Sequence, residues 1–334
     1  MSETAVGLLL LVVAGIMNAN FTLPMKFTRK WAWENTWLVW TIFALLIFPP
    51  LIAILTVPDL GGVYVQAGAA PILIVAACGA GWGIAQVFFG LAVDAIGIGL
   101  AFAIILGISA AVGSLITLVS KHSDKVFSPA GLAVVVGVVL VIAGVGICAV
   151  AGRRREAVLG TGPQNVSFGR GFLFCVISGL GSALVGLGLE WGGQIARAAK
   201  SSGTAEIWRP NAVWLPLMVA GAIPNLIFCI HLIRKNKTRT KFKESGSGAY
   251  WVLAAIMAFF WFASTLMYGI STAKMGSLGG AIAWPLFMSL IVIVASVVGI
   301  LTGEWKNTGT RPVRIQMFGV AVLIIAVVVL SRAT

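Results

Sequence analysis

The amino-acid sequence predicts an all-α integral membrane protein with ten transmembrane helices, arranged as a 5+5 inverted-topology repeat. The first supporting observation is composition: apolar residues fill 59% of the 334 positions, charged residues fill 10%, and the mean hydropathy is +1.02. Soluble domains carry about 25% charged residues, so most of this chain's surface is expected to face lipid. The second observation is the presence of 40 glycines, because helices in a bilayer approach one another through small residues. The third is a repeat that relates the two halves of the chain.

Ten apolar runs are long enough to span a bilayer, which requires about 20 mainly apolar residues. Strands are not expected, because backbone polar groups in lipid have to be hydrogen-bonded within their own segment. Little more than residues 94–97 separates the third run from the fourth, which predicts a tight hairpin. The expected spans cover approximately residues 5–24, 35–57, 71–93, 97–119, 131–151, 171–196, 211–233, 249–272, 277–302 and 314–331.

The positions of lysine and arginine predict the orientation in the membrane. When the loops are assigned alternately to two sides, 16 of the 23 basic residues fall on one side and 7 on the other. Cytoplasmic loops carry the excess of basic residues, so both termini are expected in the periplasm. The same bias explains the net charge of +13. Membrane lipids are therefore expected partners, and nucleic acid is not.

The repeat becomes visible when the sequence is shifted by 179 residues. The third span then falls on the eighth, and both read W-x3-(Q/T)-x2-(F/Y)-G-x6-G. Two weaker correspondences relate the first span to the sixth and the second to the seventh, where Trp40 and Trp214 each stand ten residues before a proline. The aligned pairs of the third and eighth spans are Trp82 with Trp261, Gln86 with Thr265, Phe89 with Tyr268, Gly90 with Gly269 and Gly97 with Gly276.

Five spans in each half is an odd number, so the two halves are expected to insert with opposite orientation. The expected boundaries are 1–152 for the N-terminal repeat, 153–170 for a cytoplasmic linker and 171–334 for the C-terminal repeat. In carriers built from inverted repeats, the substrate site lies near the membrane midplane. This organisation predicts a transporter that moves its substrate by alternating access, through rocking of the two halves.

Two segments resemble a known family. They are KWAWE at 30–34, which follows a Pro-Met-Lys turn, and GEWKNTGTRP at 303–312. Both are similar to segments of the L-rhamnose–proton symporter family, within the drug/metabolite transporter superfamily. The resemblance runs the whole length of the chain. It implies a carrier of the bacterial inner membrane that imports a monosaccharide together with a proton and needs no cofactor.

The aromatic and polar residues of the repeat are the candidate sugar-binding residues. A neutral sugar needs hydrogen-bonding side chains and an aromatic surface, and residues four and seven apart share a helix face. The third span offers one such stripe and the eighth span offers its counterpart; the alternative is that both stripes only pack helix against helix. The candidates are Trp82, Gln86, Phe89, Trp261, Thr265 and Tyr268, with Asn18, Gln194, Trp214 and Trp284 as further ones. Other tryptophans are interpreted as interface anchors, namely Trp31, Trp33, Trp37, Trp208, Trp251 and Trp305.

Glu190 is the candidate for proton coupling. It is the single acid in the uncharged stretch 171–196, and burial of an ionisable residue in a span is expensive enough to suggest function. The alternative is that Glu190 already lies at the outer rim of the membrane. Glu34 is interpreted as an interfacial charge.

No covalent chemistry is expected. The chain has no HExxH, Walker or Gly-x-Ser-x-Gly motif, so no catalytic residue is assigned. The four cysteines lie in apolar runs without metal-ligand spacing, and no metal site is expected. Two alternative functions stay open: export of a metabolite or drug by the same fold, and a membrane scaffold that transports nothing.

Overall fold

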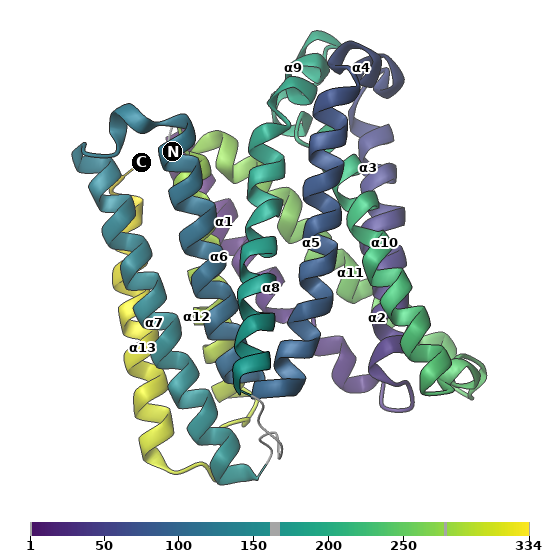
Figure 1. Cartoon of the computed structure of the whole chain (residues 1–334), viewed down its shortest axis with the longest axis vertical. Coiled ribbons are helices and arrows are strands. Elements are labelled where there is room, and N and C mark those ends of the chain that lie inside the picture. The colour runs from purple at the N-terminus through teal and green to yellow at the C-terminus, as the bar shows by residue number, and fades with distance from the viewer. Residues whose placement is uncertain (1, 161–167, 277–278, 334) are drawn as a thin grey trace. The chain divides into compact units, whose positions relative to one another are not determined.

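The computed structural model describes residues 2–160, 168–276 and 279–333, and within these ranges every regular element is a helix (Figure 1). Nine helical stretches of the described chain are long and apolar enough to cross a membrane, which confirms the membrane class. Three of them join several elements: α1 (Glu3–Asn20) with the short turn that follows it; α2 (Trp33–Thr41) with a π-helical segment (Ile42–Ile47) and α3 (Phe48–Thr56); and α8 (Phe168–Trp191) with α9 (Gly193–Ser201). The other six are formed mainly by one long helix each: α5 (Ala69–Ile96), α7 (Pro129–Leu159), α10 (Asn211–Lys235), α11 (Ser247–Lys274), α12 (Gly279–Leu301) and α13 (Thr310–Ser331).

The one expected span missing from these nine, the fourth at residues 97–119, corresponds to α6 (Ile98–Lys121), whose described apolar part is Ile104–Ser120. Gly97 alone separates α5 from α6, and its φ is +83°. Side chains are strained in this left-handed region and glycine is not. The tight hairpin predicted between the third and fourth spans is therefore present.

The helices group into two compact units. Unit 1 consists of Met1–Ile16, Ala85–Gly186 and Ser271–Thr334, and unit 2 consists of Met17–Ile84 and Leu187–Ile270. Each unit takes segments from both of the expected repeats. The linker expected at 153–170 begins inside α7, which continues to Leu159, and its residues 161–167 lie outside the described part of the chain.

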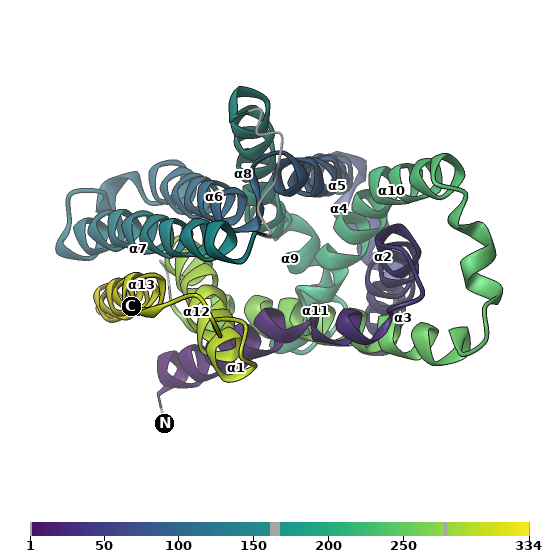
Figure 2. The same ribbon diagram turned by 90° about the horizontal axis from the view of Figure 1, so that it is seen from below.

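Unit 1 is held together by close packing at glycines. α7 lies beside α13 (Figure 2), and a Cβ added at Gly144 would stand 2.7 Å from Leu323 Cγ. A Cβ at Gly319 would stand 2.6 Å from Cys148 Sγ. The N- and C-terminal ends lie at the same end of this unit (Figure 1), as expected if both termini are on one side of a membrane.

Unit 2 contains an equally close contact between α5 and α10. A Cβ added at Gly79 would collide with the Leu217 carbonyl oxygen, and one at Gly83 would collide with the Gly221 carbonyl oxygen. Trp82, which lies between these two glycines on α5, packs against Gly221. The small residues of α5 thus let its backbone approach that of α10.

A short helix, α4 (Leu60–Ala67), supports α10 where proline interrupts it. Pro216 has no backbone N–H, so the Ala212 carbonyl lacks its usual partner within the helix. The hydroxyl of Tyr64 donates a hydrogen bond of 2.9 Å to this carbonyl oxygen. Burial raises the pKa of the Tyr64 hydroxyl above its usual value, so the hydroxyl stays a donor at neutral pH as an ordinary tyrosine does.

Replacing Tyr64 with phenylalanine is expected to destabilise the protein by about 1–3 kcal/mol, because the Ala212 carbonyl then loses its partner. Thermal unfolding in detergent measures the effect. Tyr250→Phe is the matched control, since the Tyr250 hydroxyl makes no hydrogen bond with any described residue. Equal melting temperatures for the two variants would contradict the role of Tyr64.

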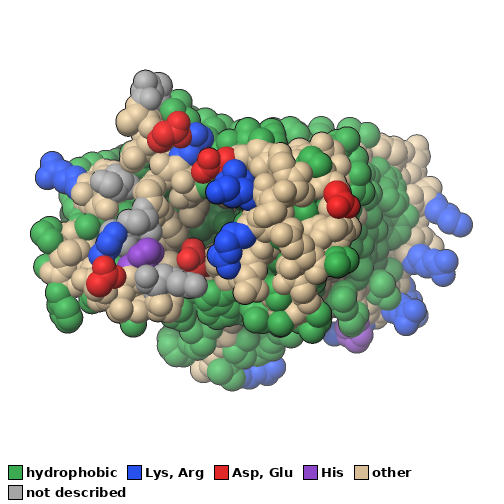
Figure 3. Space-filling model, turned by 90° about the horizontal axis from the view of Figure 1, so that it is seen from above, with side chains coloured by type: hydrophobic (Ala, Val, Ile, Leu, Met, Phe, Trp, Pro, Cys, Tyr) green, Lys and Arg blue, Asp and Glu red, His purple; other side chains and the backbone are tan. Residues whose placement is uncertain are grey.

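The surface has the polarity of a membrane protein. Figure 3 looks onto the end at which α4 and α9 lie: charged side chains gather on this face, and hydrophobic side chains form its rim. Large apolar side chains of the spans are exposed, among them Ile54 at 68%, Leu73 at 66% and Ile227 at 64%. Such exposure suits contact with lipid rather than with water.

Candidate functional site

The centre of the candidate site is a pair of stacked tryptophans in unit 2. Trp82 of α5 and Trp261 of α11 have ring centroids 5.5 Å apart and an interplanar angle of 18°. Trp82 is only 3% exposed. The two positions that the repeat aligns are therefore in direct contact, with Trp82 buried and Trp261 partly buried.

Trp40 of α2 extends this pair into a row of indoles. Its ring meets Trp261 edge-on, with centroids 5.2 Å apart and an interplanar angle of 77°. Trp37 lies 4.5 Å from Trp40, and Trp33 stacks on Trp37 at 5.0 Å, both measured between ring centroids. We call these five residues the tryptophan row; in the order of their contacts they are Trp33, Trp37, Trp40, Trp261 and Trp82.

Polar side chains lie against the backbone of α11 beside the row. Asn18 of α1 donates through Nδ2 to Ser264 Oγ at 2.9 Å. Ser264 and Thr265 in turn donate to the Trp261 carbonyl oxygen, at 2.6 and 3.0 Å. The bond of Asn18 thus ties α1 to α11 near the tryptophan row, whereas the bonds of Ser264 and Thr265 lie within α11.

The other candidates divide between the units. Tyr268 and Trp214 are buried in unit 2, with exposures of 2% and 1%. Gln194 is exposed on α9. Gln86 and Phe89 are partly buried on the section of α5 that belongs to unit 1.

Trp284 has a packing role in unit 1. Its Nε1 donates to both the carbonyl oxygen and the hydroxyl of Ser109, at 3.1 Å each. Its ring also fills the space beside Gly113, where an added Cβ would stand 2.8 Å from Trp284 Cδ1. The indole N–H is therefore already satisfied without a ligand.

Glu190 is the next-to-last residue of α8 and is partly buried. Its carboxylate forms no hydrogen bond or ion pair with any other residue that the structure describes. The chain bends directly after it, at Gly192, before α9 begins. This position agrees with the alternative that Glu190 lies near the rim of the membrane.

Glu34, interpreted from the sequence as an interfacial charge, is a buried carboxylate. It is 4% exposed, and its Oε1 accepts hydrogen bonds from Asn236 Nδ2 at 3.0 Å and Thr238 Oγ1 at 2.9 Å. It stands in the first turn of α2, where the helix dipole favours a negative charge. The sequence did not reveal this burial because both partners come from a connection about 200 residues away.

The segment at 30–34 fastens the start of α2 to the connection between α10 and α11. Trp31 Nε1 donates to the Lys241 carbonyl oxygen at 3.0 Å, and Lys241 Nζ donates to the Lys30 carbonyl oxygen at 2.9 Å. Trp31 and Trp37 are 6% and 8% exposed. Their interpretation as interface anchors was therefore wrong, because both are held inside unit 2.

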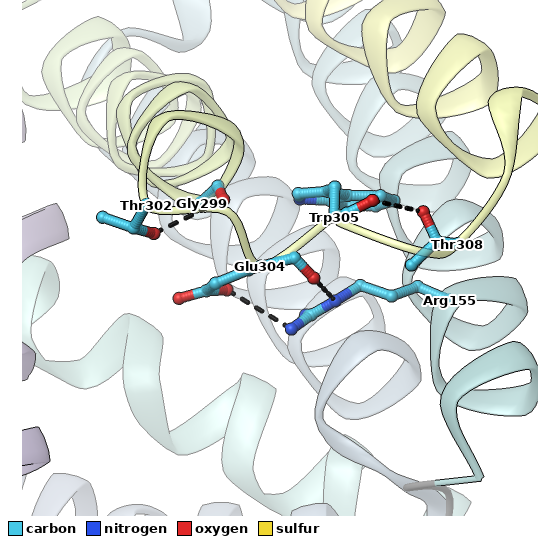
Figure 4. A network of polar contacts seen from close by, with 6 residues as sticks. All are labelled: Arg155, Gly299, Thr302, Glu304, Trp305 and Thr308. Carbon is cyan, nitrogen blue, oxygen red and sulfur yellow. Dashed lines mark hydrogen bonds and ion pairs between the residues drawn. The ribbon is translucent and has the colours of Figure 1, made fainter.

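The segment at 303–312 encloses Arg155 in unit 1 (Figure 4). The guanidinium donates through Nε to the Glu304 carbonyl oxygen at 2.8 Å and lies 3.5 Å from its carboxylate. It also sits over the Trp305 ring, 5.5 Å from the centroid. Gly303, Asn307 and Gly309 have φ values of +77°, +63° and +76°, and these residues let the chain turn tightly enough to surround the arginine.

Replacing Arg155 with lysine is expected to destabilise unit 1 by about 1 kcal/mol. A lysine keeps the charge but lacks the planar fork that bonds Glu304 and covers Trp305 at once. The melting temperature in detergent reports the change. Arg153→Lys is the control, because Arg153 is exposed and has no partner in the described chain. A control that melts as early as Arg155→Lys would refute the role of the fork.

Comparisons with known proteins agree with these motifs. The family model of the L-rhamnose-proton symport protein matches residues 1–333. An L-rhamnose-proton symporter of Cronobacter sakazakii is 29% identical over 98% of both chains, and one of Salmonella gallinarum is 30% identical over 92% of both. One of Mannheimia succiniciproducens is 28% identical over 92% of both.

The family is one of symporters, so the expectation of a transporter rather than an enzyme is confirmed by the match. The membrane-spanning helices of this chain, its segments at 30–34 and 303–312 and the family match over residues 1–333 agree. The chain belongs to the L-rhamnose-proton symport protein family.

Proposed function

We propose that this protein imports L-rhamnose or a similar monosaccharide together with a proton across the bacterial inner membrane. The tryptophan row supports this proposal most directly, because stacked and edge-on indoles offer the flat apolar surface that the C–H face of a sugar needs. The names of the relatives support the choice of sugar and of the proton. Within the row, Trp82 and Trp261 would contact the ring, with Asn18, Thr265 and Tyr268 as polar neighbours.

The proposed architecture is ten spans in two inverted repeats, with both termini in the periplasm. The charge bias of the loops supports the orientation, and the contact between the repeat-aligned Trp82 and Trp261 supports the repeat. Alternating access then exposes the tryptophan row first to the periplasm and next to the cytoplasm. Gln194 and Trp214 remain proposed sugar-binding residues of unit 2, and Gln86, Phe89 and Trp284 remain proposed ones of unit 1.

Purified protein in liposomes tests the function. With an acidic exterior, labelled L-rhamnose is expected to accumulate above its external concentration, and a protonophore is expected to collapse this accumulation. Sugar uptake that does not depend on the pH gradient would contradict the proposed coupling to protons. Failure of every monosaccharide tested, together with proton-driven movement of other metabolites outward, would favour an exporter instead.

Glu190→Gln is expected to abolish uphill accumulation while leaving sugar exchange intact, because exchange needs no net proton movement. Glu34→Gln is the matched variant, since it removes the buried carboxylate at the start of α2 but leaves its two hydrogen-bond donors in place. It is expected to lower stability and to keep coupling. Coupling lost in Glu34→Gln and retained in Glu190→Gln would transfer the role to Glu34.

A further inference from the structure

Two buried indole N–H groups of unit 2 have no hydrogen-bond partner among the described residues. They are Nε1 of Trp40 and Nε1 of Trp214, and each side chain is 1% exposed. An unpaired buried donor costs about 1–3 kcal/mol, so a native structure that retains two requires an explanation. Three other buried indoles, those of Trp31, Trp37 and Trp284, do donate hydrogen bonds.

The same two tryptophans are also related by the repeat. Each stands ten residues before a proline, Trp40 before Pro50 and Trp214 before Pro224. The sequence pattern and the missing hydrogen bonds are independent observations, and both single out this pair. The other repeat-related pair, Trp82 and Trp261, forms the stack.

The two donors lie at different levels along α11. Trp40 touches Trp261, whereas Trp214 Nε1 lies beside Gly269, where an added Cβ would stand 3.1 Å from it. Eight residues of helix separate these levels, which is about 12 Å. The intervening turns carry the buried Thr265 and Tyr268. This interval along α11 is longer than one pyranose ring, which favours contact of one sugar with one N–H at a time.

A feature that interrupts the regular α-helical hydrogen bonding lies next to each donor. The π-helical segment begins at Ile42, two residues after Trp40, and Pro216 stands two residues after Trp214. π-Helical turns and prolines are places where a helix bends and re-aims its side chains. Both indoles are therefore held where a change in helix geometry redirects them.

We infer that Trp40 and Trp214 donate hydrogen bonds to hydroxyl oxygens of the sugar, each in a different stage of transport. The inference rests on the proposed function and extends it to two specific donors. With the orientation expected from the loop charges, Trp214 lies toward the periplasm and Trp40 toward the cytoplasm. Trp214 binds the sugar when the site is open outward, and Trp40 binds it when the site is open inward.

The test replaces each tryptophan with 3-benzothienylalanine, which keeps the shape of the indole and has sulfur in place of N–H. Transport of L-rhamnose is measured in right-side-out and inside-out vesicles. The Trp214 analogue is expected to raise KM about five- to tenfold for entry from the periplasmic side, and the Trp40 analogue for entry from the cytoplasmic side. Melting temperatures stay at the wild-type value, because no bond within the protein is lost.

The Trp31 analogue is the matched control, since its N–H is bonded to the Lys241 carbonyl oxygen: its melting temperature falls and its KM does not change. A second measurement uses deoxy analogues of the sugar. Removing the sugar hydroxyl that accepts the indole N–H is expected to raise KM in the wild type but not in the analogue that lacks this donor. A double-mutant cycle measures this coupling.

Unchanged KM from both sides in both analogues would overturn the inference. A Trp40 analogue that melts earlier at unchanged KM would assign its N–H to the ring of Trp261 and remove it as a sugar donor. Wild-type vesicles in the same assay report the proposed function separately, because its failure would abolish the sugar signal itself.

Discussion

Trp261→Ala is expected to lower the efficiency of L-rhamnose uptake about 30- to 100-fold. The side chain is stacked on Trp82 and meets Trp40 edge-on, so its loss removes the shared wall of the tryptophan row. Truncation of a tryptophan at the centre of a binding surface commonly costs about 2 kcal/mol or more, and each 1.4 kcal/mol is a factor of ten. Initial uptake rates at several sugar concentrations, corrected for the amount of protein in the membrane, measure the change.

The matched control is Trp251→Ala, ten residues earlier on the same helix. Trp251 is 40% exposed and contacts Trp31 and Phe242 rather than the site. Its removal is expected to leave uptake within about twofold of the wild type, as for most surface substitutions. Trp261→Phe keeps an aromatic face and is expected to recover part of the activity. A Trp261→Ala protein with wild-type uptake would leave the row as packing only.

Gly79→Val is expected to prevent unit 2 from folding. Any side chain at this position collides with the backbone carbonyl of Leu217, and a backbone cannot move aside as a flexible side chain does. α5 and α10 would have to separate along their contact. The expected loss in the free energy of unfolding is more than about 4 kcal/mol, which is larger than the loss caused by most single substitutions. The yield of monodisperse protein in size-exclusion chromatography and its melting temperature measure the outcome.

Gly146→Val is the matched control, because Gly146 also lies within a membrane-spanning helix and an added Cβ there meets nothing within 4 Å. The control is expected to give wild-type yield. If Gly79→Val were recovered in the same amount and melted at the same temperature, the close approach of α5 and α10 would not be needed for folding.

The sequence predicted the features that depend on neighbouring residues. Span positions follow from local apolar runs, and the hairpin at Gly97 follows from the shortness of the connection. The alignment of the two halves singled out Trp82 and Trp261 as a pair, but it did not predict that their rings stack on one another.

Features that depend on distant partners were not foreseen. Glu34 looks like a membrane-edge charge until the connection carrying Asn236 and Thr238 is placed over it. Trp37 looks like an anchor until Asn225 of α10 accepts its N–H at 3.3 Å. Trp40 carried a signal, its spacing to Pro50, but no local pattern places its ring against Trp261.

The enclosure of Arg155 bears on how this lineage is recognised. The stretch that most clearly marks the family, around Glu304 and Trp305, contacts a guanidinium in unit 1, whereas the indoles that we propose bind the sugar belong to unit 2. Under this proposal, family membership and sugar preference depend on separate residues. A family member that transports a different sugar can keep the segment around Glu304 and Trp305 unchanged. The transported sugar should therefore be inferred from the indoles and their neighbours.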